Sequence, residues 1–138
     1  MKNAIEPTED QLAKFLSRAG DGPVHMVNLL KFRDKAAYPD GRDPDLSGVD
    51  AYMRYGGPMT GLVEAAGGSL KFSAMTSPLL VGELDGEWDM VAIMTYPSAA
   101  TLAEIAATPE FEAIAVHRKA GLEGQLLIPC FAPETFIA

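Results

Sequence analysis

One positively charged side chain, Arg118, interrupts an apolar stripe on a predicted helix near the C-terminus. Successive helical residues turn by about 100°, which places one stripe on Phe111, Ile114, Ala115, Arg118 and Leu122. The arginine stem can pack while its head reaches water or pairs with Glu83 or Asp89. Alternatively, the guanidinium anchors a carboxylate, phosphate or carbonyl oxygen of a ligand. Both interpretations remain open at this point.

Two titratable side chains are candidates for proton transfer, and we name His117 and Asp89 as the catalytic candidates. His117 lies beside the Arg118 stripe. It is either a surface histidine favoured by the C-terminal end of the helix dipole, or a general base or haem ligand. Asp89 follows a predicted turn and is also a candidate salt-bridge partner of Arg118.

A predicted buried strand, VHMVNLLKFRD from Val24 to Asp34, carries His25 and Asn28. Because side chains alternate along a strand, these two face opposite sides of the sheet, one toward the helices and one toward a dimer interface. The Asn28 amide offers a donor and an acceptor, either to a backbone group or to a ligand. We therefore predict Asn28 as a ligand-binding residue.

Three aromatic residues complete the predicted ligand-binding set: Tyr52, Tyr55 and Trp88. The two tyrosines share one face of a predicted helix, and Trp88 opens the strand predicted at 88–96. Large aromatic side chains are usually core residues, and their polar atoms need a partner when buried.

No motif for a metal or a cofactor is present, and we predict neither. The sequence lacks HExxH, CxxC, GxSxG, P-loop and GxGxxG patterns, and its two histidines have no paired spacing. Asp40, Asp43 and Asp45 resemble a calcium loop only weakly, and we expect them to be solvated. Cys130 lies in an apolar run, which favours an inert buried thiol.

Length and charge limit the function classes. The 138 residues fit one domain, 1–138. The net charge of -8 argues against nucleic acids and anionic membrane surfaces as partners. We find no apolar run near the roughly 20 residues that span a bilayer and no signal-peptide core, so we expect a cytoplasmic protein.

Capping signals predict the helices. Thr8 opens an N-terminal helix that ends before Gly20, and Ser47 opens a second one that ends at Gly67. We expect a kink or break in the second helix at Gly56-Gly57-Pro58, because proline removes a backbone hydrogen bond. Ser98 and Thr108 cap two further helices, the last running to Gly121.

Apolar segments between the helices predict four strands. After Val24–Asp34, a strand at 69–83 is disturbed at Pro78, and a turn at Asp85-Gly86 leads into a strand at 88–96. The apolar run at 125–131 is the last strand. The order is a helix followed by two strand-helix-strand units, which predicts an α+β fold of ferredoxin-like type, with a four-stranded antiparallel sheet and helices on one face.

The strand at 88–96 is apolar on both of its faces, where a solvated face would alternate with charged residues. Burial against the sheet of a second copy explains this pattern. We therefore predict a homodimer formed through the open sheet face.

The chain resembles the DUF1330 family of the dimeric α/β barrel superfamily. The matching segments, which span most of the chain, are VNLLKFR (27–33), SGVDAYMRYG (47–56), GG (67–68), GELDGEWD (82–89), YPS (96–98), PEF (109–111) and Arg118. The resemblance implies a dimer in which each subunit keeps a cleft between its sheet and its helices. Superfamily relatives use that cleft for cofactor-free oxygenation, haem binding or degradation, dehydration and isomerisation, so the fold does not select a chemistry.

Three functional hypotheses follow. The first is a small-molecule enzyme or binding protein that holds an acidic or carbonyl-bearing organic ligand with Asn28, a tyrosine and Arg118. The second is haem binding or degradation, for which Asn28, Trp88 and His117 supply the residue types that some haem-degrading relatives use. The third is a noncatalytic dimeric module.

Overall fold

A computed structural model describes residues 4–84 and 86–131 of the chain. The elements, in chain order, are α1 (Glu9–Arg18), β1 (Val24–Phe32), α2 (Gly48–Ala65), β2 (Ser69–Met75), β3 (Met90–Tyr96), α3 (Ala99–Ala106), α4 (Pro109–Gly121) and β4 (Leu122–Cys130). The four predicted helix caps are confirmed, because the side chains of Thr8, Ser47, Ser98 and Thr108 each accept a backbone N–H of the first helical turn.

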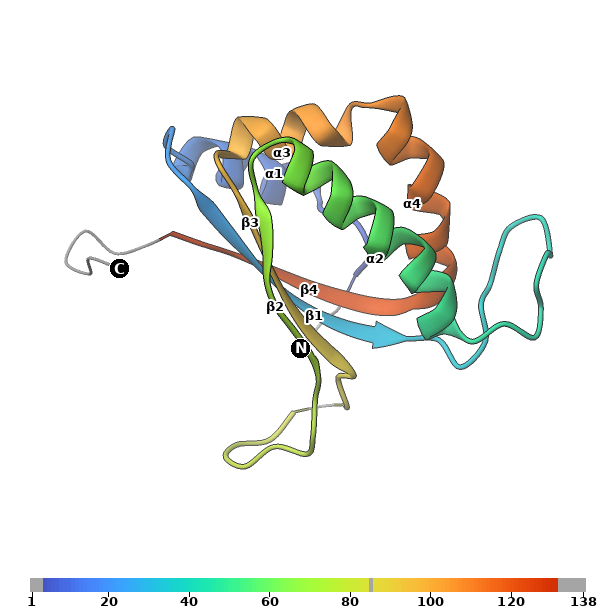
Figure 1. The fold of residues 1–138 in the computed structure, drawn as a ribbon. Helices are drawn as coiled ribbons and strands as arrows, with labels where there is room; N and C mark the ends of the chain where they lie inside the picture. The colour runs from blue at the N-terminus through green and yellow to red at the C-terminus, as the bar shows by residue number, and fades with distance from the viewer. Residues whose placement is uncertain (1–3, 85, 132–138) are drawn as a thin grey trace.

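The four strands form one antiparallel sheet in the order β2-β3-β1-β4. The helices gather on one face of this sheet and leave the other face open (Figure 1). The order places β1 and β3 in the centre, as two interleaved strand-helix-strand units require. The predicted α+β, ferredoxin-like fold is therefore confirmed.

The side chains of β1 point alternately to the two faces of the sheet. Val24, Met26 and Leu30 are buried under the helices, and Asn28 has the same parity. His25 has the opposite parity, and its Nδ1 lies 2.8 Å from the hydroxyl of Thr95 on β3. The expectation that these two polar residues face opposite sides is confirmed.

Of the kink or break predicted in the second helix, the break is wrong, because α2 runs as one helix from Gly48 to Ala65 with Pro58 inside it. Pro58 and Arg54 are exposed, so the carbonyl that loses its hydrogen bond can be hydrated. Met59 and Val63 are buried against the sheet directly after the proline. Their packing holds the helix together across the interruption.

The connection between β2 and β3 is longer than predicted. Strand β2 ends at Met75 and β3 begins at Met90, so Trp88 and Asp89 precede the strand that the sequence assigns to them. The two strands do pair with each other, as expected. The intervening loop extends beyond the end of the sheet (Figure 1) and exposes 98% of Leu80.

Helices α2 and α4 pack side by side, and two glycines set their closest approach. A Cβ on Gly121 would lie 2.4 Å from the carbonyl oxygen of Gly48 and 2.7 Å from the backbone nitrogen of Tyr52. A Cβ on Gly48 would lie 2.1 Å from the carbonyl oxygen of Arg33. Glycine is therefore required at Gly121 for the end of α4 to reach the start of α2, and at Gly48 for the start of α2 to lie against Arg33.

Candidate functional site

Arg118 projects from α4 toward the edge of the sheet. Its Nη1 donates to the backbone carbonyl of Ile5 at 2.8 Å and to the side-chain oxygen of Gln125 at 2.9 Å. Both acceptors are neutral, and no carboxylate in residues 4–84 and 86–131 forms an ion pair with this guanidinium. The predicted pairing with Glu83 or Asp89 is therefore not what holds Arg118.

Gln125 is held in turn by Asn28. The Gln125 Nε2 donates to Asn28 Oδ1 at 2.7 Å, and Asn28 Nδ2 donates to the carbonyls of Met26 and Ala92, both at 3.2 Å. Asn28 thus links the centre of the sheet to Gln125, and Gln125 to Arg118. In this position the Asn28 amide orients the arginine, and its own hydrogen bonds go to protein groups.

The segment Ala4–Thr8, which we call the N-terminal strap, covers this chain of hydrogen bonds. Ala4 and Gln125 exchange two backbone hydrogen bonds of 3.2 and 2.8 Å along the edge of β4. Glu6 forms a 2.6 Å ion pair with Lys119 of α4. Lys119, and to a smaller extent Arg118, lowers the pKa of Glu6. The strap therefore joins the edge strand to α4 beside Arg118.

Tyr52 and Tyr55 lie on α2 close to Arg118. Burial raises the pKa of both phenols, and the nearby Arg118 charge partly opposes that rise. The rings form a chain of contacts between β1, α2 and α4. Ring centroids are 5.3 Å apart for Phe32 and Tyr52, 5.5 Å for Tyr52 and Tyr55, and 6.2 Å for Tyr55 and Phe111.

Tyr96, at the end of β3, is only 5% exposed. Burial raises its pKa strongly, and the phenols of Tyr55 and Tyr52 add to the rise. Tyr55 packs against the core cluster to which Tyr96 belongs. We call Tyr52, Tyr55 and Tyr96 the phenol cluster. All three phenols remain protonated and able to donate at neutral pH.

The hydroxyls of the phenol cluster have no hydrogen-bond partner within the part of the chain that the structure describes. In that same part, every side-chain nitrogen or oxygen that is fully cut off from solvent does have a partner. The three hydroxyls therefore keep contact with solvent, although Tyr96 is almost completely buried. Buried hydroxyls of this kind normally bind water or a ligand.

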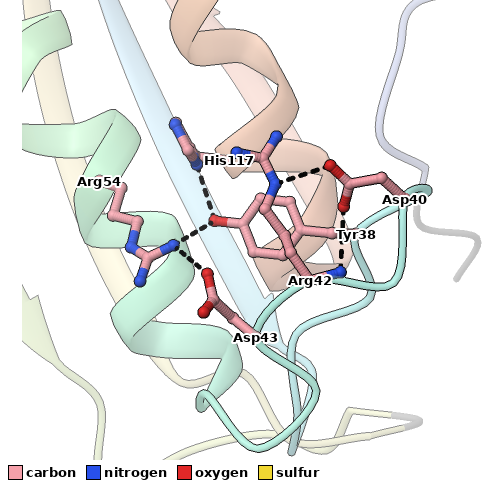
Figure 2. A network of polar contacts seen from close by, with 6 residues as sticks. All are labelled: Tyr38, Asp40, Arg42, Asp43, Arg54 and His117. Carbon is pink, nitrogen blue, oxygen red and sulfur yellow. Dashed lines mark hydrogen bonds and ion pairs between the residues drawn. The ribbon is translucent and has the colours of Figure 1, made fainter.

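His117 points away from Arg118 and belongs to a second group of polar residues. Its Nδ1 lies 2.7 Å from the hydroxyl of Tyr38, and Arg54 donates to the same hydroxyl at 3.3 Å and to Asp43 at 2.8 Å (Figure 2). Arg42 pairs with Asp40 at 3.1 Å and lies over the Tyr38 ring. We call these six residues the loop network, because they fasten the loop between β1 and α2 onto α2 and α4.

Burial lowers the pKa of His117, and the charges of Arg42 and Arg54 lower it further. The histidine is therefore neutral at pH 7, and its Nδ1 shares a hydrogen bond with the Tyr38 hydroxyl, whose oxygen accepts from Arg54. Arg42 and Arg54 oppose the protonation of His117. These charges act against the effect of the helix dipole, which would favour the protonated histidine.

Asp89 and Trp88 lie at the end of the loop before β3. The Asp89 carboxylate accepts the backbone N–H of Phe32 at 2.8 Å, and its own N–H donates to the carbonyl of Leu30. The Trp88 carbonyl accepts the hydroxyl of Thr76. These contacts end the strand pairing and fasten the loop to β1.

The predicted site residues thus separate into three places. Asn28 and Arg118 are linked through Gln125, and the charge of Arg118 acts on the phenols of Tyr52 and Tyr55. His117 lies in the loop network, and Trp88 and Asp89 lie at the end of the β2–β3 loop. The three residue types of the haem hypothesis, Asn28, Trp88 and His117, are not gathered into one site. Proton transfer by His117 or Asp89 stays a prediction, and it would occur away from Arg118.

Sequence reasoning missed Gln125, Tyr96 and Tyr38. A polar residue in the apolar run 125–131 was a signal for Gln125, because β4 pairs with β1 so that Leu30 opposes Gln125 and Asn28 is its diagonal neighbour. Tyr96 gave no signal beyond its apolar strand. Tyr38 lies in a loop dense in Asp, Pro and Gly, where an aromatic residue buried to 95% was unexpected.

Metal and membrane signals are absent from the described residues. Residues 4–84 and 86–131 contain no group of three or more His, Cys, Asp or Glu side chains placed to hold a metal ion. Asp40, Asp43 and Asp45 are instead paired with Arg42, Arg54 and Lys35. Within the same residues no helix is both long and apolar enough to cross a membrane.

Solved structures provide the comparison with known proteins. RPA0582, a protein of unknown function from Rhodopseudomonas palustris, superposes in its methylated form with a TM-score of 0.86 and 35% sequence identity over 98% of each chain. A hydroxynitrile lyase from Passiflora edulis gives a TM-score of 0.59 at 13% identity, covering 86% of this chain and 100% of its own. A dimeric ferredoxin-like protein of unknown function from Jannaschia sp. CCS1 gives 0.54 at 14% identity, covering 80% of this chain and 100% of its own.

The two more distant structures show the fold alone. No protein-family model matches the chain, so membership of DUF1330 stays a prediction, and no curated protein matches it. The likeness to RPA0582 extends over nearly the whole length of both proteins. The chain belongs to the same protein family as RPA0582.

Proposed function

We propose that this protein binds a small organic ligand with a carboxylate or carbonyl oxygen in the space between its sheet and the helices α2 and α4. The observation that carries the proposal is that Arg118 is held by two neutral acceptors while its charge acts on the phenols of Tyr52 and Tyr55. The charge of Arg118 has no ion-pair partner in the described residues. Its Nη1 is already held by hydrogen bonds to Gln125 and to Ile5 of the strap. A guanidinium and neutral phenols are all donors, which suits an oxygen-rich, negatively polarised group.

The remaining donors of Arg118 are the groups available for this task. Within residues 4–84 and 86–131, its Nε and Nη2 have no hydrogen-bond acceptor. A carboxylate can take two parallel hydrogen bonds from such a fork. The relay through Gln125 and Asn28 fixes the guanidinium before the ligand arrives, which reduces the entropy lost on binding.

Chemistry at this position is a further part of the proposal. Donors aimed at a carbonyl oxygen stabilise the negative charge that develops when that carbonyl is attacked or enolised. A structural neighbour is a hydroxynitrile lyase, which supports an enzyme with this fold but not a particular reaction.

The test is a thermal-shift screen of carboxylates and ketones against the wild type and Arg118→Met. We expect at least one acid to raise the Tm of the wild type, and Arg118→Met to weaken its binding by about 1.5–3 kcal/mol, the range of a charge-assisted hydrogen bond. Arg54→Met is the matched control, because it removes a guanidinium from the loop network. It should lower the Tm and leave the affinity for the acid unchanged.

Two outcomes contradict the proposal. One is that no acid or ketone in the screen stabilises the wild type. The other is that Arg118→Met binds the acid as tightly as the wild type, whereas Arg54→Met binds it more weakly. In the second case the acid binds at the loop network instead.

We also propose a homodimer that covers the open face of the sheet. The middle of that face is apolar, and the polar pair of His25 and Thr95 lies at one end of it. The apolar residues are Phe72, Ala74, Val27, Leu29, Val91, Ile93, Leu126 and Ile128. Phe72 is 53% exposed, and exposed apolar patches of this kind mark interaction surfaces. A dimeric ferredoxin-like neighbour and the resemblance to DUF1330 support the same assembly.

Ile93 tests the dimer, because it lies between Phe72 of β2 and Val27 of β1. Light scattering at micromolar concentration should give the mass of a dimer for the wild type and of a monomer for Ile93→Glu. A monomeric wild type would contradict this part of the proposal and would leave the ligand site untouched.

A further inference from the structure

Four aromatic rings form a line that includes Tyr52 and Tyr55 of the proposed ligand site, and this inference rests on the function proposed above. The ring contacts from Phe32 through Tyr52 and Tyr55 to Phe111 bring residues of β1, α2 and α4 into one continuous line. The interplanar angles of 55°, 52° and 80° are tilted or edge-on. Such rings present both edges and faces to a neighbour, and aromatic pairs prefer edge-to-face and offset contacts.

The polar side of the site carries one positive charge. Arg118 is the guanidinium that acts on the pKa of Tyr52 and Tyr55, and the phenols themselves are neutral. Glu6 of the strap lies near Arg118, but Lys119 balances its charge, so this pair adds no net positive charge beside Arg118. The site therefore matches a ligand with one negative charge better than a phosphate ester with two.

From this combination of one guanidinium, three donor phenols and a line of four rings, we infer that the ligand of this site is an aromatic monocarboxylate. Its carboxylate accepts from Arg118 and from hydroxyls of the phenol cluster. Its ring packs against Tyr52, Tyr55 and Phe111. The inference selects a ligand class within the broader group of acids and carbonyl compounds.

Isothermal titration with three probes tests the inference. Phenylacetate has the ring and one negative charge, cyclohexylacetate has the same charge on a saturated ring of similar size, and phenyl phosphate has the ring on a dianion. We expect phenylacetate to bind the dimeric wild type about three- to tenfold more tightly than cyclohexylacetate, the gain of one or two aromatic contacts. Phenyl phosphate should bind more weakly than phenylacetate.

Variants locate the preference. Tyr55→Leu should reduce the ratio of the two affinities to near one, because it removes the ring that joins Tyr52 to Phe111. If Tyr55→Leu does not fold, Phe111→Leu removes the neighbouring ring. Phe131→Leu is the control, since this exposed ring follows β4 and lies outside the line, and it should keep the wild-type ratio.

The outcomes separate the two proposals. Equal affinity for phenylacetate and cyclohexylacetate, or tighter binding of phenyl phosphate, overturns the ligand class and leaves acid binding at Arg118 intact. An unchanged ratio in a folded Tyr55→Leu or Phe111→Leu protein also overturns it. If neither carboxylate binds, and the acid screen has also failed, the proposed function falls together with this inference.

Discussion

The loop network and the phenol cluster both combine arginine with tyrosine, but their polar groups are partnered to different degrees. In the loop network the Tyr38 hydroxyl contacts both His117 and Arg54, and each arginine has its own aspartate. In the phenol cluster three hydroxyls have no partner among the described residues, and Arg118 is held by neutral groups. A set of groups that satisfies itself stabilises the fold, whereas unsatisfied donors leave hydrogen bonds for a ligand.

The comparison also explains why residue type alone assigns a site poorly. His117 and Arg118 are neighbours in sequence, yet the turn of α4 sends one to the outer loop and the other to the sheet edge. The histidine, the more usual catalytic residue, lies in the saturated network. The arginine, which also serves as a structural residue in many proteins, lies next to the unsatisfied hydroxyls.

The largest effect is expected from Gly121→Ala, which should disturb both regions at once. The new Cβ would collide with the backbone of Gly48 and Tyr52, so α2 and α4 must separate. We expect a loss of about 3 kcal/mol in the free energy of unfolding, the upper part of the usual range for overpacking. Urea denaturation measures it. Gly57→Ala is the control, because a Cβ there meets nothing within 4 Å.

Tyr38→Phe should have the next largest effect and should be confined to the loop network. It removes one hydroxyl and leaves His117 Nδ1 and an Arg54 N–H without their partner. A loss of about 1–3 kcal/mol is expected for a partly buried pair of this kind. Urea denaturation gives the value, and acid binding at Arg118 should not change. A variant as stable as the wild type would show that the network does not fasten the loop.

The stability of the protein should fall on acidification through the titration of His117. Its pKa is lowered in the folded state, so between the folded pKa and the ordinary value near 6.5 the unfolded chain binds more protons. Stability is therefore highest above the ordinary pKa and declines as the pH falls toward the folded one.

His117→Asn tests this pH dependence, since it keeps a hydrogen-bond acceptor near Nδ1 and cannot titrate. Denaturation curves at a series of pH values should show a smaller decline for His117→Asn than for the wild type. Equal declines would assign the acid sensitivity to other groups.

Tyr96→Phe should have the smallest effect on stability, although it is the same chemical change as Tyr38→Phe and Tyr96 is equally buried. Its hydroxyl has no protein partner in the described residues, so we expect a change within about 0.5 kcal/mol or a slight stabilisation. Thermal unfolding of both variants side by side gives the contrast. If Tyr96→Phe cost as much stability as Tyr38→Phe, the Tyr96 hydroxyl would have a hydrogen-bond partner. The phenol cluster would then not differ from the loop network in this respect.

Local signals in the sequence predicted local structure well. Thr8, Ser47, Ser98 and Thr108 predicted four helix starts, because a capping side chain acts on its own helix and needs no distant partner. The four-stranded antiparallel sheet also followed from the order of the elements. The strand at 69–83 was predicted too long, because its end depends on where β3 stops pairing with it and on the contacts of Asp89 with β1.

The candidate site was predicted in part for the same reason. Arg118, Tyr52 and Tyr55 stood out by their places on helix faces, and the charge of Arg118 acts on both phenols. Their part in ligand binding stays a prediction. Gln125 and Tyr96 become visible only through the register between strands that are far apart in sequence. Pro58 misled because propensity describes an isolated helix, whereas α2 is held by the packing of Met59 and Val63.

The N-terminal strap has a practical consequence for anyone who purifies this protein. Ile5 accepts a hydrogen bond from Arg118, and Ala4 pairs with the edge of β4, so the start of the chain is built into the surroundings of the candidate site. An affinity tag fused to the N-terminus would sit within a few residues of these contacts. Binding assays on an N-terminally tagged sample would therefore be made on a protein in which the strap beside Arg118 is altered. A cleavable N-terminal tag, or a tag at the other end of the chain, is the safer choice.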